Sequence, residues 1–105
     1  MSSTFETYIQ VTLGDNLAEA IFQRNEVGVT TPEQADIALS TAKTEMQELA
    51  SRITRLFKQL QSEGALPAQG DTLDFHDNLK ILVTARHFQE KPGELTIEFT
   101  VDIKE

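Results

Sequence analysis

The side chains best suited to chemistry are concentrated in one short segment, GDTLDFHDN. It holds Asp71, Asp74, His76 and Asp77 within seven residues. Carboxylate oxygens and imidazole nitrogens are ligands that Ca2+, Mn2+ or Zn2+ accept. The spacing matches neither an EF-hand loop, which needs a glutamate at its twelfth position, nor the H-E-x-x-H pattern of zinc enzymes. Because aspartates also form turns before strands, the segment is only a weak candidate for the site of a metal-dependent enzyme or a cation sensor.

Other catalytic motifs are not found in the sequence. The chain has no cysteine, no G-x-S-x-G nucleophile turn and no glycine-rich phosphate loop. Its two histidines are His76 and His87, and the alternation around His87 predicts that this side chain points inward, at a strand end. We therefore expect a protein that is not an enzyme and needs no cofactor.

The charge balance excludes several classes of partner. Nine basic and 17 acidic residues give a net charge of −8, whereas binding to phosphates needs clustered lysine and arginine. We expect no nucleic-acid or membrane partner. Residues 17–39 resemble a helix-turn-helix in their apolar pattern, but the gap between the two helices is too long and Glu33 and Asp36 oppose entry into a groove. An acidic chain instead suits a basic protein partner, of the inhibitor, antitoxin or immunity type.

A single basic cluster stands out in this acidic chain. It consists of Arg52, Arg55 and Lys58. These residues either complement the negative end of a helix dipole or offer a docking point for an acidic segment.

Length and hydropathy predict a small cytoplasmic domain. The 105 residues are typical of one domain, 1–105, and no apolar run reaches the roughly 20 residues that span a bilayer. The first ten residues lack the charged and apolar regions of a signal peptide.

The periodicity of the chain predicts an α+β fold in the order β-α-α-β-β. Residues 4–13, beginning with Thr4 and Phe5, alternate as a half-buried strand. A short helix over 16–25, capped by Asp15 or Asn16, follows it. Residues 79–88 and 94–104 alternate around Pro92-Gly93 and form a hairpin. We expect an antiparallel sheet of at least three strands with both helices on one face. The sequence does not decide which edge of the hairpin the first strand joins.

The hairpin register can also be predicted. Pairing residues whose numbers sum to 182 leaves a five-residue loop and places Ala85 opposite Ile97 and Lys80 opposite Asp102. In that register Leu82 and Phe88 share the solvent face of the sheet, and we expect Tyr8 of the first strand on the same face. Three large apolar side chains there indicate partial cover.

The clearest signals mark a long helix over 32–63. Thr31 caps it, Pro32 occupies its first position, Gln34 completes a capping box, and Gly64 ends it. Its heptad a and d positions are all apolar: Ala35, Leu39, Ala42, Met46, Leu49, Ile53, Leu56 and Leu60.

This helix is too long for a small sheet. At about 1.5 Å per residue it outruns a ten-residue strand, so its apolar edge needs cover. The short helix could fold back on it, the helix could break near 40–44, or a second copy could cover it. We expect self-association, with an interface drawn from Leu39, Met46, Leu49, Ile53, Leu56, Leu60, Leu82 and Phe88.

Overall fold

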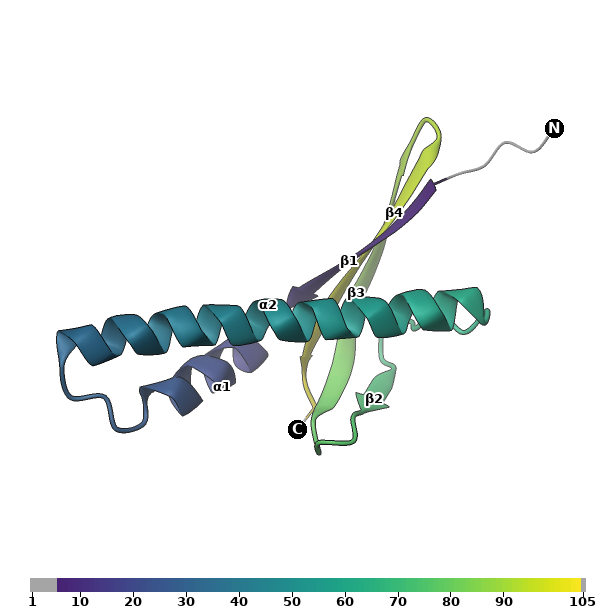
Figure 1. Ribbon diagram of the computed structural model, residues 1–105. Helices are drawn as coiled ribbons and strands as arrows, with labels where there is room; N and C mark the ends of the chain where they lie inside the picture. Colours follow the sequence, from purple (N-terminus) through teal and green to yellow (C-terminus); the bar gives the residue numbers. More distant parts are fainter. Residues whose placement is uncertain (1–5, 105) are drawn as a thin grey trace.

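The computed structural model describes residues 6–104, so the predicted strand residues Thr4 and Phe5 lie outside the described part. The elements are β1 (Glu6–Leu13), α1 (Asp15–Glu26), α2 (Pro32–Ser62), β2 (Thr72–Asp74), β3 (Lys80–Lys91) and β4 (Glu94–Ile103). Figure 1 shows α2 crossing one face of a single sheet, with α1 beside α2, past the end of β1. The predicted α+β fold and the order β-α-α-β-β are confirmed, with β2 as an additional short strand.

The sheet is mixed, so the prediction of a purely antiparallel sheet is wrong. Its strand order is β1-β4-β3-β2, and β1 runs parallel to β4 while the other two pairings are antiparallel. The error has a simple cause. Alternation shows which residues share a face, but it is the same whichever way a neighbouring strand runs.

The predicted hairpin register is also wrong. Lys91 pairs with Glu94, so Pro92 and Gly93 form a two-residue turn in place of the expected five-residue loop. A register shift between Val83 and Ala85 then moves the pairing by one residue. Such a bulge bends the strand and exchanges the faces of the residues beyond it.

The bulge changes the predicted face of two side chains. Phe88 lies opposite Ile97, on the core face of the sheet, so its predicted position on the solvent face is wrong. His87 lies opposite Glu98 on the uncovered face, so its predicted inward orientation is wrong. Leu82 comes before the bulge and lies opposite Asp102 on the uncovered face, as expected.

α2 is one continuous helix of 31 residues, about 46 Å long at about 1.5 Å per residue. The Thr31 side chain accepts a hydrogen bond from the Gln34 backbone N–H at 3.2 Å, which confirms the predicted cap. The Gln34 side chain reaches back one residue further than in a standard capping box and accepts from the Thr30 N–H at 2.8 Å.

The core lies between α2, α1 and the inner face of the sheet. Its largest fully buried side chains are Phe57, Phe99, Ile53, Ile81, Val83 and Val101. The rings of Phe57 and Phe99 pack edge to face, 4.6 Å between centroids, and join α2 to β4. The predicted stripe of α2 is therefore core in its C-terminal half.

The N-terminal half of α2 and all of α1 form an arm that projects past β1 (Figure 1). The molecule measures 62 × 27 × 20 Å, with a radius of gyration of 16.5 Å. A compact chain of this length has a radius of gyration of about 13 Å. The short helix thus covers part of the overhang, and α2 does not break.

Candidate functional site

The arm is held together by an apolar seam between its two helices. Ala38 and Ala42 of α2 are buried, as are Leu17 and Ile21 of α1. The small alanine side chains allow the two helices to approach closely.

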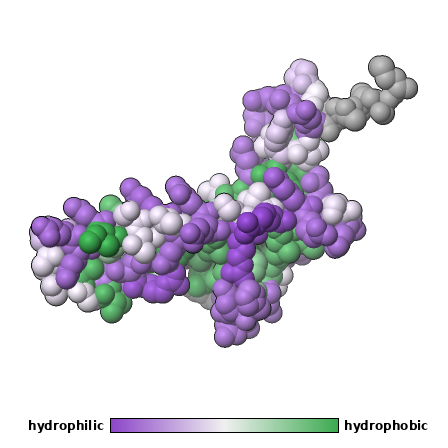
Figure 2. Space-filling view, in the orientation of Figure 1, coloured by the Kyte–Doolittle hydropathy of each residue, from purple (hydrophilic) through white to green (hydrophobic). Residues whose placement is uncertain are grey.

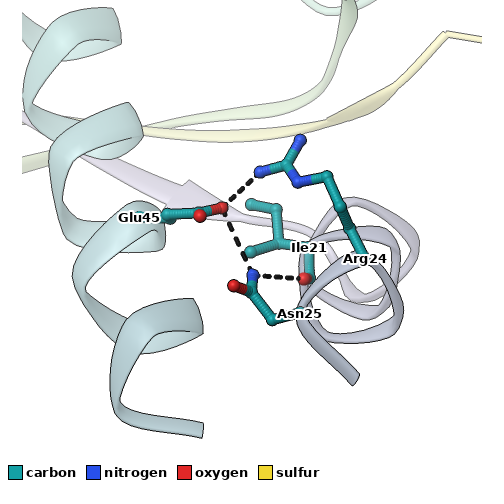
Figure 3. Close-up of polar contacts among 4 residues, drawn as sticks. All are labelled: Ile21, Arg24, Asn25 and Glu45. Carbon is teal, nitrogen blue, oxygen red and sulfur yellow. Dashed lines mark hydrogen bonds and ion pairs between the residues drawn. The ribbon is translucent and has the colours of Figure 1, made fainter. Parts of the chain in front are cut away.

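A polar network closes one flank of the arm (Figure 3). Arg24 of α1 forms an ion pair with Glu45 of α2. Asn25 donates to the Ile21 carbonyl at 2.9 Å and to the Glu45 carboxylate at 3.4 Å. The hydrogen bond from Arg24 lowers the pKa of Glu45, because it stabilises the charged carboxylate. The network therefore fixes α1 against α2.

A second ion pair fixes α2 against the turn before β3. Arg52 donates to both carboxylate oxygens of Asp77, at 2.9 and 3.2 Å, and its guanidinium lies 4.5 Å from the Phe75 ring centroid. The bond from Arg52 lowers the pKa of Asp77. Arg52 thus stabilises the packing of α2 against this turn. Of the predicted basic cluster, only Arg55 and Lys58 are exposed.

Between the two ion pairs lies a cleft of about 500 Å3. Its walls are apolar residues of α1, α2 and the strand ends, and its charged rim includes both ion pairs. Because the charges of each ion pair are already paired with each other, they fix α1 and the β2–β3 turn against α2 rather than present free groups to a ligand. Glu48 is the rim carboxylate without an ion pair among residues 6–104.

The weak metal candidates do not converge. Asp77 is paired with Arg52, and Asp71 accepts a hydrogen bond from the Ala68 N–H at 2.7 Å. Asp74 lies opposite Lys80 in the β2–β3 ladder, and His76 is exposed. Within residues 6–104, no group of three or more metal-ligating side chains is placed to hold an ion.

The predicted interface residues divide into core and surface. Ile53 is fully buried within one copy. Four others are half-buried and pack against the core: Met46, Leu49, Leu56 and Leu60. Leu82 is half-buried on the uncovered sheet face, and Leu39 and Phe88 are exposed, at 44% and 48%.

The structure adds apolar surface that the heptad pattern did not select. Ile37 is 67% exposed and Val27 is 83% exposed, both near the end of the arm. Figure 2 shows hydrophobic patches at this end, on an arm that is otherwise largely hydrophilic. Ile37 was missed because it lies outside the a/d stripe, although an isolated isoleucine on the polar face of a helix is itself a signal.

The two flanks of α2 differ in what covers them. α1 lies on the side of α2 toward the β2–β3 turn (Figure 1), and the cleft and both ion pairs lie between α1, α2 and that turn. The opposite flank carries Leu39, Lys43, Met46 and Ala50, at helical spacing, and we call it the Leu39 flank. At its outer end an apolar groove of about 260 Å3 separates α1 from α2, lined by Phe22, Glu26, Val29, Ala35, Ala38 and Leu39.

No family model, curated protein or solved structure matches the chain. No helix among the described residues has both the length and the apolar character needed to cross a membrane.

Proposed function

We propose that the protein is a non-enzymatic assembly protein that self-associates through the Leu39 flank of α2. One observation carries the proposal: α2 projects past its own sheet, and α1 covers only one of its flanks. On the Leu39 flank, Leu39 stays exposed beside the apolar groove, whereas Met46, further along the helix, packs against the core. Covering such surface is favourable by about 25 cal/mol per Å2.

The charge distribution along α2 favours a second copy in the antiparallel direction. Glu33 and Asp36 lie near its N-terminus, and Arg55 and Lys58 lie near its C-terminus. None of these four forms an ion pair within residues 6–104. Two antiparallel α2 helices bring the acidic end of each toward the basic end of the other, which offsets the repulsion between two chains of charge −8.

Capture of a basic protein remains the alternative, but the surface supports it less well. Two of the three acidic residues of β4 on the uncovered sheet face lie opposite a lysine or a histidine of β3, and the third, Asp102, lies opposite Leu82. Glu94 lies opposite Lys91, and Glu98 lies opposite His87. The field over this face is therefore mixed rather than uniformly negative.

A matched pair of variants tests the proposal. Leu39→Glu and Ile37→Glu each add one charge at an exposed apolar position of α2, but on different sides of the helix. In sedimentation velocity, Leu39→Glu should dissociate the wild-type dimer, whereas Ile37→Glu should leave it intact. A monomeric wild type would overturn the proposal, and equal effects of the two substitutions would remove the Leu39 flank from it.

A further inference from the structure

β1 has a free edge along its whole length. It is the outermost strand of the sheet and pairs only with β4. The Glu6 N–H donates to the Gly93 carbonyl at 3.0 Å, and the Gly14 N–H donates to the Val101 carbonyl at 2.6 Å. In a parallel ladder the residues that bond to a given neighbour alternate, so the even-numbered residues of β1 bond to β4.

The odd-numbered residues of β1 therefore direct their backbone N–H and C=O groups away from the sheet. They are Thr7, Ile9, Val11 and Leu13. None of these groups has a hydrogen-bond partner within residues 6–104. A row of such groups is a template for another strand.

The opposite side of the sheet is protected, and β1 is not. On that side β2 has only three residues, and beyond it the free edge of β3 carries a bulge and four charge-bearing or titratable residues: Arg86, His87, Glu90 and Lys91. Charges and bulges are the usual devices that prevent edge pairing. Residues 7–13 of β1 have no charge, no proline and no register shift.

We infer that two copies pair through their β1 edges, antiparallel, with Gln10 opposite the partner's Gln10. The inference rests on the proposed self-association and names the backbone surface that joins the two copies. In this register Thr7 lies opposite the partner's Leu13, and Ile9 lies opposite the partner's Val11. All four outward residues of each copy then form hydrogen-bonded pairs, so no outward N–H or C=O of residues 7–13 is left over.

The side chains fit a copy better than a foreign peptide. Ile9 and Val11 extend the apolar inner face, and on the outer face Tyr8 lies opposite the partner's Thr12, an aromatic and β-branched pair. The register uses the uncharged segment from end to end, so Glu6 and Asp15 stay outside it. Two acidic chains can therefore join here without placing like charges opposite each other.

The same pairing covers the Leu39 flank. The twofold axis of an antiparallel strand pair stands perpendicular to the sheet, so the helices of both copies lie on the same face. α2 and the partner's α2 then run antiparallel in one layer. The β3–β4 hairpin lies on the side of α2 opposite the β2–β3 turn (Figure 1), and we place the second α2 on that side, against the Leu39 flank.

A charge exchange at Gln10 tests the register, because this residue meets itself across the axis. Gln10 is exposed, and its backbone N–H bonds within the monomer, so substitution leaves the fold intact. Gln10→Lys should raise the dimer dissociation constant by about tenfold or more, since two lysines then lie opposite each other. Mixing the Gln10→Lys chain with a Gln10→Glu chain should restore a dimer. Gln89→Lys, the same exchange on the same sheet face two strands away, is the control and should leave the dimer unchanged.

Each outcome decides a different claim. A monomeric wild type overturns the proposed function, and this inference with it. A wild-type dimer in which Gln10→Lys behaves like Gln89→Lys overturns the β1 pairing and leaves self-association through α2 standing. Loss of the dimer in Gln10→Lys with recovery in the mixture supports the pairing, and loss without recovery overturns the register at Gln10.

Discussion

Asp102 of β4 caps the first turn of α1, since its carboxylate accepts a hydrogen bond from the Leu17 N–H at 2.7 Å. The two residues are 85 positions apart. No side chain near the start of α1 provides a cap, because Gly14 occupies the N-cap position. The parallel pairing of β1 with β4 brings Asp102 to this point. A carboxylate at this position also interacts favourably with the positive end of the helix dipole.

Removal of the Asp102 carboxylate should therefore loosen α1. We expect Asp102→Ala to lower the free energy of unfolding by about 1 kcal/mol, the usual value of an N-cap. Asp102→Asn keeps an acceptor oxygen and should lose less. Urea denaturation monitored by circular dichroism measures both, with the exposed Asp74→Ala as the control. Equal stability of Asp102→Ala and the control would show that the cap contributes nothing.

Gly14 should not tolerate a side chain. A Cβ atom at this position would lie 2.5 Å from the Asp102 Oδ2 and 2.9 Å from the Asp102 Cβ, so the cap would have to shift. We expect Gly14→Ala to be destabilising, although alanine usually stabilises a chain by restricting the unfolded state. Gly14→Ala in the Asp102→Ala background should cost less than in the wild type, and thermal unfolding of the four chains measures this coupling.

Substitutions at Ile53 and at Leu39 should have different effects, the first on folding and the second on assembly. Both residues occupy position a of the same heptad pattern. Ile53 is fully buried in the core and Leu39 is exposed. Ile53→Ala should lower the free energy of unfolding by about 2–5 kcal/mol, as large-to-small core changes do. Leu39→Ala should leave the unfolding of the isolated monomer nearly unchanged. If both variants unfold at the same denaturant concentration under dilute conditions, Leu39 belongs to the core.

Acid should weaken the links that fix the arm and the β2–β3 turn. The pKa values of Glu45 and Asp77 are lowered in the folded chain by Arg24 and Arg52. A carboxyl whose folded pKa is depressed contributes stability above its unfolded pKa, about 4, and loses that contribution as the pH falls through the folded value. Both pairs are largely exposed, so the effect is small.

Carboxyl titration by NMR measures this effect directly. The Asp77 pKa should rise toward its ordinary value in Arg52→Gln, and the Glu45 pKa should rise in Arg24→Gln. Each substitution should leave the other carboxyl unchanged, because the two pairs share no residue. An Asp77 pKa that does not respond to Arg52→Gln would contradict the bidentate pair.

The sequence predicts α2 well because its signals are local. Thr31, Pro32 and Gly64 mark its ends, and the apolar spacing marks its buried face. The direction of β1 and the capping of α1 by Asp102 do not have local sequence signals of this kind. Both depend on which strands meet, and neither alternation nor any cap residue near Asp15 carries that information. No glycine, proline or other turn residue in the sequence marks the bulge at Thr84, yet the bulge determines on which face of the sheet His87 and Phe88 lie.

The candidate surface was predictable only in part. The length of the apolar a and d pattern predicts that α2 extends past the sheet, which is confirmed, and Leu39 belongs to that pattern; that a second copy covers it stays a prediction. The same pattern cannot separate Leu39 from Ile53, because burial depends on where the helix crosses the sheet. The free edge of β1 needs the strand order, since any alternating strand has the same appearance at an edge or in the centre.

The molar mass in solution tests self-association most directly. Sedimentation equilibrium at tens of micromolar, near physiological salt, should give twice the chain mass of 11.7 kDa. The mass should fall toward that of one chain for Leu39→Glu and Gln10→Lys, and it should not fall for Ile37→Glu or Gln89→Lys. A wild-type mass of one chain across this concentration range would contradict self-association.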